Sequence, residues 1–282
     1  VVTLKTPPTT VVKSNVIYNL DGVNVAITSD HYPLYCDFKK PTGLEEYPKA
    51  EGDLRIGNYF LTYCKGTDGV IDYDRTGRII AKMNADIVCL QGLDKETERS
   101  EGIDQLNVLA QKANMHDYFA KAIDYKGGEF GVGILTKEEP VSVDRYQMAG
   151  KSEMRAAMVV EYEKFVVAST NFDTDMAKRI EALQTLETKL SAYNKPAFLL
   201  GYFNEGDLES EFFQMVKSNW NLLSADKSTE VSGKKRRLDF IVSLKSHNVN
   251  VTQADVIESL SGVDVTVAST HYPLFCDFSG LK

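Results

Sequence analysis

A long internal repeat limits how this chain can fold. When the sequence is shifted by 240 positions, residues 1–38 align with residues 241–278 without a gap, and 18 of the 38 pairs are identical. The match is clearest where Ser29–Phe38 aligns with Ser269–Phe278, because both segments contain His-Tyr-Pro-Leu and end in Cys-Asp-Phe. A repeat with the period of a whole domain indicates tandem homologous domains and excludes a solenoid. We therefore expect residues 1–40 to be the last strands of a preceding domain.

The repeat divides the chain into three parts. Residues 1–40 form a tail, residues 41–52 form a linker rich in charged residues, Pro and Gly, and residues 53–282 form one complete domain. The C-terminal copy of the repeat closes smaller loops than the tail could, so we expect it to occupy the domain's sheet. The tail should then pair as a hairpin with a sheet edge or a second chain. Because the chain starts at Val1 and not at Met, we expect it to be processed or cut from something longer, and secretion or a periplasmic location stays open.

Composition excludes several classes of protein. The 282 residues are 43% hydrophobic, which is enough for a sizeable core. The four cysteines occur singly in apolar runs, and we expect small buried hydrophobes, because no Cys-x-x-Cys or histidine cluster suggests zinc. No segment approaches the roughly 18 apolar residues that span a bilayer, so we expect a soluble segment without a membrane span. With 32 basic and 40 acidic residues the net charge is -8, which argues against nucleic acid as a partner.

Short apolar and alternating runs predict many strands, and helical spacing predicts a few helices. The strands are expected at residues 54–64, 86–91, 118–122, 131–136, 155–163, 164–170, 196–201, 237–242, 254–257 and 273–278, and the helices at 75–84, 103–113 and 175–193. Adjacent strands without an intervening helix, as in 155–170, indicate antiparallel pairing. The predicted fold class is α/β (α+β), a four-layer sandwich of two packed, mainly antiparallel sheets flanked by helices.

Six motifs follow one another along residues 53–282. They are Asn84–Gln91, Arg99–Gln105, Gly131–Lys137, Leu200–Asn204, Leu238–Ile241 and Ser269–Pro273. In order and spacing they resemble the motif series of the endonuclease/exonuclease/phosphatase family, which has the deoxyribonuclease-I-like fold. The resemblance implies phosphoester hydrolysis with a divalent cation, usually magnesium, held by carboxylate and amide oxygens. It also implies a histidine oriented by an aspartate that handles protons or phosphate oxygens.

Several positions depart from the family pattern. In the family, the strand that matches Asp86–Gln91 ends in Gln-Glu and the Glu binds the metal, whereas Gly92 follows here. The register of the first strand places Phe60 where the family has a metal-site Asn. Three further replacements affect a catalytic His, an Asp of Gly-Asp-Phe-Asn and the Asp of Asp-His: Asn171, Tyr202 and Thr270. Since no metal carboxylate is left, we predict that hydrolysis is lost and that no metal cofactor binds, whereas magnesium is expected in an active relative.

Some site residues match the family and could form the remains of its catalytic site. These are His271, Asp239 and Asn204, and we expect Asp239 within hydrogen-bond reach of His271, although a buried structural histidine is an alternative. A possible ligand cleft contains Phe60, Tyr202, Asn171 and Arg155. Its two aromatic rings could stack on a sugar or apolar group, or they could close the cleft by packing on each other.

Two hypotheses about function follow from these departures. In the first, this domain is a pseudoenzyme that serves as a binding or structural partner of the upstream homologous domain, which retains Asp30 and His31, and an unknown small ligand is possible. In the second, it is a residual magnesium-dependent phosphodiesterase or phosphatase whose ligands are Asp173, Asp239 and Glu205. We interpret the basic run Lys234–Arg237 as a solvated loop, because binding phosphates needs more basic residues on one face.

Overall fold

The computed structural model describes residues 10–17, 31–39 and 46–282. The chain divides into two compact units, Val1–Pro48 and Lys49–Lys282. Lys49, which the sequence placed in the linker, belongs to the second unit, where its ammonium lies 2.8 Å from the carboxylate of Asp86. Within the described ranges, no helix is long and apolar enough to cross a membrane.

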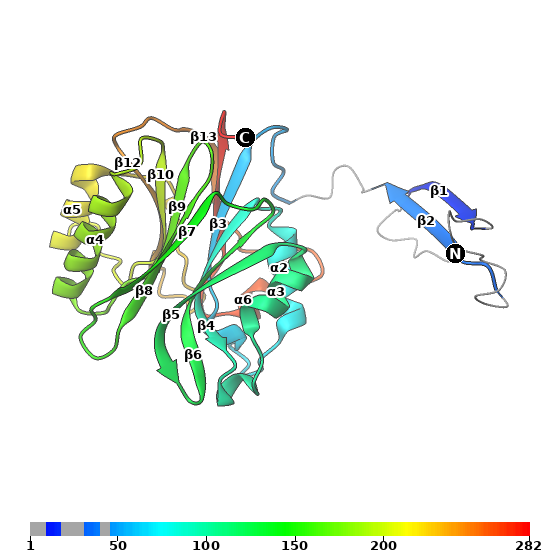
Figure 1. Cartoon of the computed structure of the whole chain (residues 1–282), viewed down its shortest axis with the longest axis horizontal. Helices are drawn as coiled ribbons and strands as arrows, with labels where there is room; N and C mark the ends of the chain where they lie inside the picture. Colours follow the sequence, from blue (N-terminus) through cyan, green and yellow to red (C-terminus); the bar gives the residue numbers. More distant parts are fainter. Residues whose placement is uncertain (1–9, 18–30, 40–45) are drawn as a thin grey trace. The chain divides into compact units, whose positions relative to one another are not determined.

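The second unit contains two six-stranded sheets that pack face to face (Figure 1). The strand order of the first sheet is β11 (Trp220–Leu222), β12 (Asp239–Leu244), β10 (Ala197–Tyr202), β9 (Val166–Asn171), β8 (Arg155–Glu161) and β7 (Ser142–Met148). The strand order of the second is β13 (Asn250–Val256), β14 (Leu274–Ser279), β3 (Leu54–Phe60), β4 (Ile87–Lys95), β6 (Gly128–Thr136) and β5 (His116–Tyr125). Two neighbouring pairs, β9 with β10 and β3 with β4, are parallel and the other pairs are antiparallel. The predicted sandwich of mainly antiparallel sheets is confirmed.

Helices cover the outer faces of both sheets (Figure 1). The first sheet carries α4 (Met176–Leu190) and α5 (Glu211–Asn219), and the side of the second carries α2 (Tyr73–Lys82), α3 (Gln105–Ala113) and the short α6 (Val265–Ala268). At the start of each of the four longer helices a side-chain oxygen accepts a hydrogen bond from a backbone N–H of the first turn; these caps are Asp72, Asp104, Asp175 and Ser210. The helices therefore begin where the sequence offers a capping residue.

Several local features differ from the sequence prediction. The short strand β11 and the four-residue helix α6 were not predicted. Strand β7 was not predicted, because its sequence is largely polar and it lies at a sheet edge with partly exposed side chains. Helix α5 was not predicted either, since it has only nine residues and is recognisable mainly by its buried Phe212 and Phe213. The first strand ends at Phe60, earlier than predicted, and continues into a short 3-10 turn at Thr62–Cys64 whose three residues all have positive φ.

The space between the sheets is filled by apolar side chains from both. Ile56 and Cys89 of the second sheet pack in one cluster with Met158, Val167 and Phe198 of the first. Among the residues whose side chains are described, the cysteines Cys64, Cys89 and Cys276 are buried and unpaired, and burial raises the pKa of each thiol. They pack as small hydrophobic residues, which agrees with the sequence interpretation.

The first unit contains a two-stranded hairpin of β1 (Thr10–Val16) and β2 (Leu34–Lys39). Its pairing repeats that of β13 with β14 position by position, since Thr10 faces Lys39 as Asn250 faces Ser279. Both hairpins also have an irregularity at the same place, between Val11 and Lys13 in the first and between Val251 and Gln253 in the second. The repeat in sequence is therefore also a repeat in backbone pairing.

A buried ion pair joins β14 to β3. The guanidinium of Arg55 donates two hydrogen bonds to the carboxylate of Asp277, each 2.7 Å long, and the two side chains are at most 1% exposed. Arg55 also donates to the carbonyl of Met83 at 3.0 Å and lies 3.9 Å from the ring centroid of Phe275. A bidentate pair of this kind fixes orientation as well as distance, so it sets the register between the two strands.

We predict that Asp277→Asn lowers the free energy of unfolding by about 3–5 kcal/mol, because it leaves the Arg55 guanidinium buried without a countercharge. Urea denaturation of the full chain measures the change. The matched control is Asp68→Asn, which removes a partner of Arg75 at the surface and should change stability little. Similar losses in the two variants would show that the buried pair does not have this role.

Candidate functional site

The candidate residues of both sheets meet at one end of the sandwich. Phe60 and Tyr202 are the last residues of β3 and β10, and Asp239 is the first residue of β12. His271 lies just before β14, and its backbone bridges to Glu230 in the loop that precedes β12. The topology thus brings together side chains that are more than 200 residues apart in sequence.

The predicted contact between Asp239 and His271 is present. Nδ1 of His271 lies 2.6 Å from Oδ2 of Asp239, and both side chains are buried. Burial disfavours the charged imidazolium, but the negative charge of Asp239 and its hydrogen bond outweigh this effect and raise the pKa of His271. The start of β12 is held in place by Thr229, because its Oγ1 accepts hydrogen bonds from the backbone N–H groups of Leu238 and Asp239.

Three rings pack against one another at this site. The ring of Phe60 lies 4.6 Å from that of Tyr202 and 4.7 Å from that of His271, measured between centroids. Tyr202 and His271 are 4.8 Å apart and meet edge to face. The two aromatic residues of the expected cleft therefore pack on each other and on the histidine, which is the closed form of the two arrangements considered from the sequence. Below, Phe60, Tyr202 and His271 are called the three-ring cluster.

Gly92 lies directly beside this cluster. It adopts a left-handed backbone conformation, with φ of 72°, at an irregularity where β4 pairs with β6. A Cβ atom at this position would lie 3.3 Å from the Phe60 ring and 3.3 Å from the backbone nitrogen of Thr62. A longer side chain at position 92 would thus be directed into space that the Phe60 ring occupies, so the replacements at positions 60 and 92 are sterically coupled.

A buried amide links the two sheets close to Gly92. Nε2 of Gln91 donates to Oδ1 of Asn58 at 2.8 Å and to Oγ of Ser169 at 3.2 Å, and Ser169 belongs to the opposite sheet. Neither Asn58 nor Ser169 was predicted to have this role. A polar residue within a strand gives no sign of its partner, so no sequence signal identified this contact.

The left-handed turn at Thr62–Cys64 is held in place by several contacts. Such a conformation costs non-glycine residues roughly 1–2 kcal/mol each. Oγ1 of Thr62 lies 3.0 Å from Oγ1 of Thr270, and Oγ of Ser269 donates to the carbonyl of Phe60 at 2.6 Å. On the other side, the guanidinium of Arg99 lies 3.6 Å from the ring centroid of Tyr63. Thr270 therefore helps to hold the turn after Phe60 at the position where the family carries an aspartate.

The remaining candidate residues have partners of their own. Nδ2 of Asn204 donates to the carbonyl of Phe172 at 2.7 Å and lies 3.5 Å from Oδ1 of Asn171. Arg155 forms an ion pair with Asp173 at 3.0 Å, and Glu205 forms one with Arg179 at 2.9 Å. Asn171 and Arg155 of the expected cleft thus serve to connect the loops around the site.

The residues present do not fit a magnesium ion. Asp173, Glu205 and Asp239, the three ligands of the alternative hypothesis, each contact a different basic side chain. In the described part of the chain, no three His, Cys, Asp or Glu side chains form a group that could hold a metal. Hard cations need several oxygen ligands at once, and Phe60, Gly92, Tyr202 and Thr270 provide no carboxylate in the positions where the family has its metal ligands.

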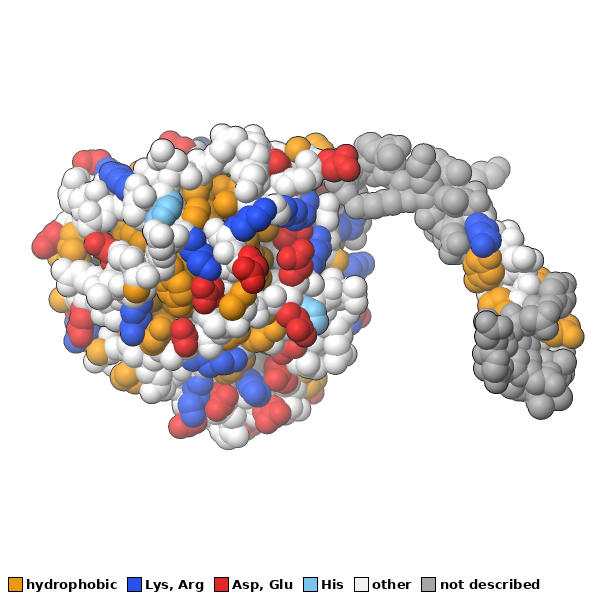
Figure 2. All heavy atoms as spheres, turned by 45° about the horizontal axis from the view of Figure 1, so that its top comes forward, with side chains coloured by type: hydrophobic (Ala, Val, Ile, Leu, Met, Phe, Trp, Pro, Cys, Tyr) orange, Lys and Arg blue, Asp and Glu red, His pale blue; other side chains and the backbone are white. Residues whose placement is uncertain are grey.

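The basic run Lys234–Arg237 does not form a single patch. Arg236 pairs with Glu230, which lowers the pKa of that carboxyl to about 2, whereas Arg237 turns inward and donates to the carbonyl of Ser224. The face shown in Figure 2 carries basic and acidic side chains interspersed with one another. Lys234, Lys235 and Arg236 are exposed, which agrees with the interpretation of the run as a surface loop.

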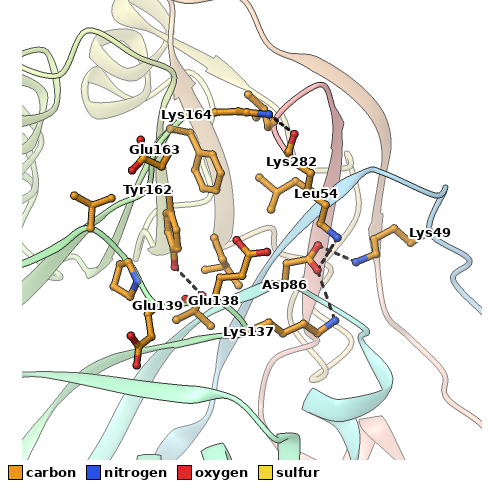
Figure 3. A pocket seen from close by; sticks show the side chains of 16 residues that line it. Lys49, Leu54, Asp86, Lys137, Glu138, Glu139, Tyr162, Glu163, Lys164 and Lys282 are labelled. Atoms are coloured by element: carbon orange, nitrogen blue, oxygen red, sulfur yellow. Dashed lines mark hydrogen bonds and ion pairs between the residues drawn. The ribbon is translucent and has the colours of Figure 1, made fainter.

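A cavity of about 840 Å³ lies at the other end of β3, lined in part by the apolar side chains of Leu54 and Phe165 (Figure 3). At its edge the ammonium groups of Lys49, Lys282 and Lys137 lie 2.8, 3.0 and 3.6 Å from the carboxylate of Asp86. Leu54 and Phe60 are the first and last residues of β3, so this cavity is separate from the three-ring cluster. No motif in the sequence pointed to it.

Comparisons with known proteins identify the fold. No family model and no curated protein matches the sequence. Among solved structures, an endonuclease/exonuclease/phosphatase from Beutenbergia cavernae matches with a TM-score of 0.66 and 18% identity, covering 82% of this chain and 73% of that chain. A mannosyl-6-phosphatase from Bacteroides thetaiotaomicron matches with a TM-score of 0.63 and 15% identity, covering 80% and 99%. A protein of unknown function from Enterococcus faecalis matches with a TM-score of 0.65 and 14% identity, and the match covers 80% of this chain and 100% of that chain. The chain thus has the endonuclease/exonuclease/phosphatase fold.

We predict that the contact between His271 and Asp239 makes stability depend on pH. The pKa of His271 is raised in the folded state above its unfolded value of 6.5. The stabilisation that the protonated histidine contributes to folding is therefore complete below pH 6.5 and is lost as pH rises through the pKa of the folded state. Urea denaturation from mildly acidic to mildly basic pH should show this decline, and Asp239→Asn should remove it. His116→Asn, at an exposed histidine, should leave the decline unchanged. An unaltered pH dependence in Asp239→Asn would contradict the assignment.

Proposed function

We propose that residues 53–282 form a domain that has lost metal-dependent phosphoester hydrolysis and acts as a binding or structural domain, that is, a pseudoenzyme. The observation that carries this proposal is the steric relation between Gly92 and Phe60. In the family that the motifs resemble, position 92 is the metal-binding glutamate. Here a Cβ atom at that position would meet the Phe60 ring at 3.3 Å, and the backbone has a φ of 72° that disfavours any other residue than glycine.

Phe60 cannot easily leave that space, because its ring packs on both Tyr202 and His271. Each of the three rings is within 5 Å of the other two, so moving one exposes the others. Aromatic pairs at such distances contribute roughly 0.5–1.5 kcal/mol beyond their burial. The cluster therefore favours the closed arrangement over one with room for an ion and a phosphate group.

The charges around the site support the same proposal. A residual phosphodiesterase or phosphatase would need Asp173, Glu205 and Asp239 to converge on a cation. Each of them would first have to separate from Arg155, Arg179 or His271. Separating a buried ion pair leaves two charges without compensation, which costs several kcal/mol. A residual phosphodiesterase or phosphatase would therefore require these three ion pairs to break, whereas a domain without hydrolytic activity requires no such change.

The proposed partner is a homologous domain that precedes this one in the same polypeptide. The support is the repeated hairpin, whose pairing matches that of β13 and β14. A small ligand is a second possibility, and the cavity near Asp86 offers about 840 Å³ for it. Nucleic acid is not proposed, because the chain has a net charge of -8 and Arg236 and Arg237 near the site already pair with Glu230 and Asp226.

We predict that the full chain shows no saturable heat when titrated with millimolar magnesium or manganese, because too few oxygen ligands are available. A generic phosphodiester such as bis(p-nitrophenyl) phosphate should not be hydrolysed above the background rate under the same conditions. Stoichiometric metal binding together with turnover would show that the domain is an active enzyme with a different ligand set.

We also predict that Gly92→Glu does not restore hydrolysis and lowers the free energy of unfolding by about 1–2 kcal/mol, because a non-glycine residue is strained there. Gly92→Ala is the matched control for backbone strain without a long side chain. The steric coupling predicts that Gly92→Glu combined with Phe60→Ala loses less stability than the sum of the two single variants.

Urea denaturation of the four chains gives this coupling directly. Additive losses would mean that the side chain at position 92 does not compete with the Phe60 ring. Hydrolysis by Gly92→Glu alone would show that β4 has been aligned wrongly with the family motif that ends in the metal-binding Glu.

A further inference from the structure

The hairpin of β1 and β2 reproduces the β13–β14 hairpin down to single hydrogen bonds. The backbone N–H of Ile17 donates to the carbonyl of Pro33 at 2.7 Å, and that of Ile257 donates to the carbonyl of Pro273 at 2.8 Å. Each pair is related by the same shift of 240 positions that relates the sequences. Because β2 is the equivalent of β14, the strand that pairs with β14 in the complete domain indicates the kind of strand that β2 can pair with.

In the complete domain, the second edge of β14 pairs with β3. The pairing is antiparallel and runs from Leu274 opposite Asn58 to Phe278 opposite Leu54. It places Asp277 directly opposite Arg55, with which it forms the buried ion pair. Among the described residues, β2 is paired with β1 alone, so the edge that corresponds to this one has no strand beside it.

The side chains of the two copies differ in exposure in the way that a missing strand predicts. Leu274 is fully buried in the domain, whereas Leu34 at the equivalent position is 59% exposed. Beyond Leu34, β2 keeps the Cys-Asp-Phe sequence of β14, so Asp37 stands at the register position of Asp277. A strand with core-type apolar residues and an open edge is a template for strand addition.

We propose that the open edge of β2 binds the first strand of a preceding homologous domain of the same polypeptide, antiparallel and with an arginine opposite Asp37. This inference rests on the tandem arrangement proposed above. The β3 strand of the present domain is not available for this role, because β14 and β4 already occupy its two edges. For the same reason a second copy of this chain offers no free strand of the required kind.

The partner strand should resemble β3 in two respects. It should carry an arginine at the position of Arg55, because a buried aspartate opposite an apolar residue would lose its countercharge. It should also carry an apolar residue at the position of Ile56, which packs in the same core cluster as Leu274, since the equivalent Leu34 is 59% exposed. A two-stranded hairpin is marginally stable by itself, so a third strand should also stabilise the tail.

The test uses the full chain with a copy of residues 53–61 placed before Val1 and joined by a flexible Gly/Ser linker. Such a tether raises the local concentration of the strand to the millimolar range, which makes weak pairing measurable. Hydrogen exchange, followed by mass spectrometry, should show amide protection of Leu34–Lys39 rising by about tenfold over the unextended chain. Exchange in β14 should not change.

Charge reversal tests the proposed register. Changing the arginine of the added strand to aspartate should abolish the extra protection, and this variant leaves residues 1–282 untouched, so misfolding of the tail cannot explain a loss. Combining it with Asp37→Arg should restore the protection. The proposal would be overturned if no chain with an added strand showed extra amide protection of Leu34–Lys39. It would also be overturned if this protection were the same for every combination of charges at the arginine of the added strand and at residue 37.

Two further outcomes would also overturn it. Altered exchange in β14 would mean that the added strand enters the sheet of the complete domain. Protection that depends on protein concentration and accompanies a dimer in sedimentation would identify a second molecule as the partner. Neither outcome bears on the absence of hydrolysis, which the magnesium titration tests separately.

Discussion

The buried ion pair between Arg55 and Asp277 is the constraint on which the site depends most directly. It fixes the register of β14 against β3, and β14 begins three residues after His271. A shift of this strand by one residue would turn its side chains to the opposite face of the sheet. The position of His271 beside Phe60 and Asp239 is therefore a consequence of an interaction made at the far end of the same strand pair.

The positions of the site that match the family motifs and the positions that depart from them are in direct contact with one another. Asp239 and His271 remain in hydrogen-bond contact, whereas Phe60 and Tyr202 occupy space next to the histidine. The absence of a side chain at Gly92 leaves room for the Phe60 ring, so these two residues are compatible with each other. Sheet pairing and core packing do not require metal ligands, so the fold by itself does not decide which chemistry the site can perform.

Much of the fold could be predicted from the sequence, because strand periodicity, repeats and ordered motifs are local signals. The polar edge strand β7, the short helix α5 and the left-handed turn after Phe60 could not, since each is decided by its tertiary surroundings. The pairing of Asp239 with His271 followed from intact motifs. The bond of Gln91 to Ser169 and the lysines around Asp86 did not, because contacts between distant polar residues leave no pattern in one sequence.

The buried cysteines give this protein a set of internal reporters. Cys64 lies in the left-handed turn, Cys89 in the central strand β4 and Cys276 in β14, next to the aspartate of the ion pair. Each thiol is shielded from solvent and protonated, and only an exposed thiolate reacts readily. Alkylation at each position therefore measures how often that part of the sandwich opens, which distinguishes loosening of the site from separation of the sheets.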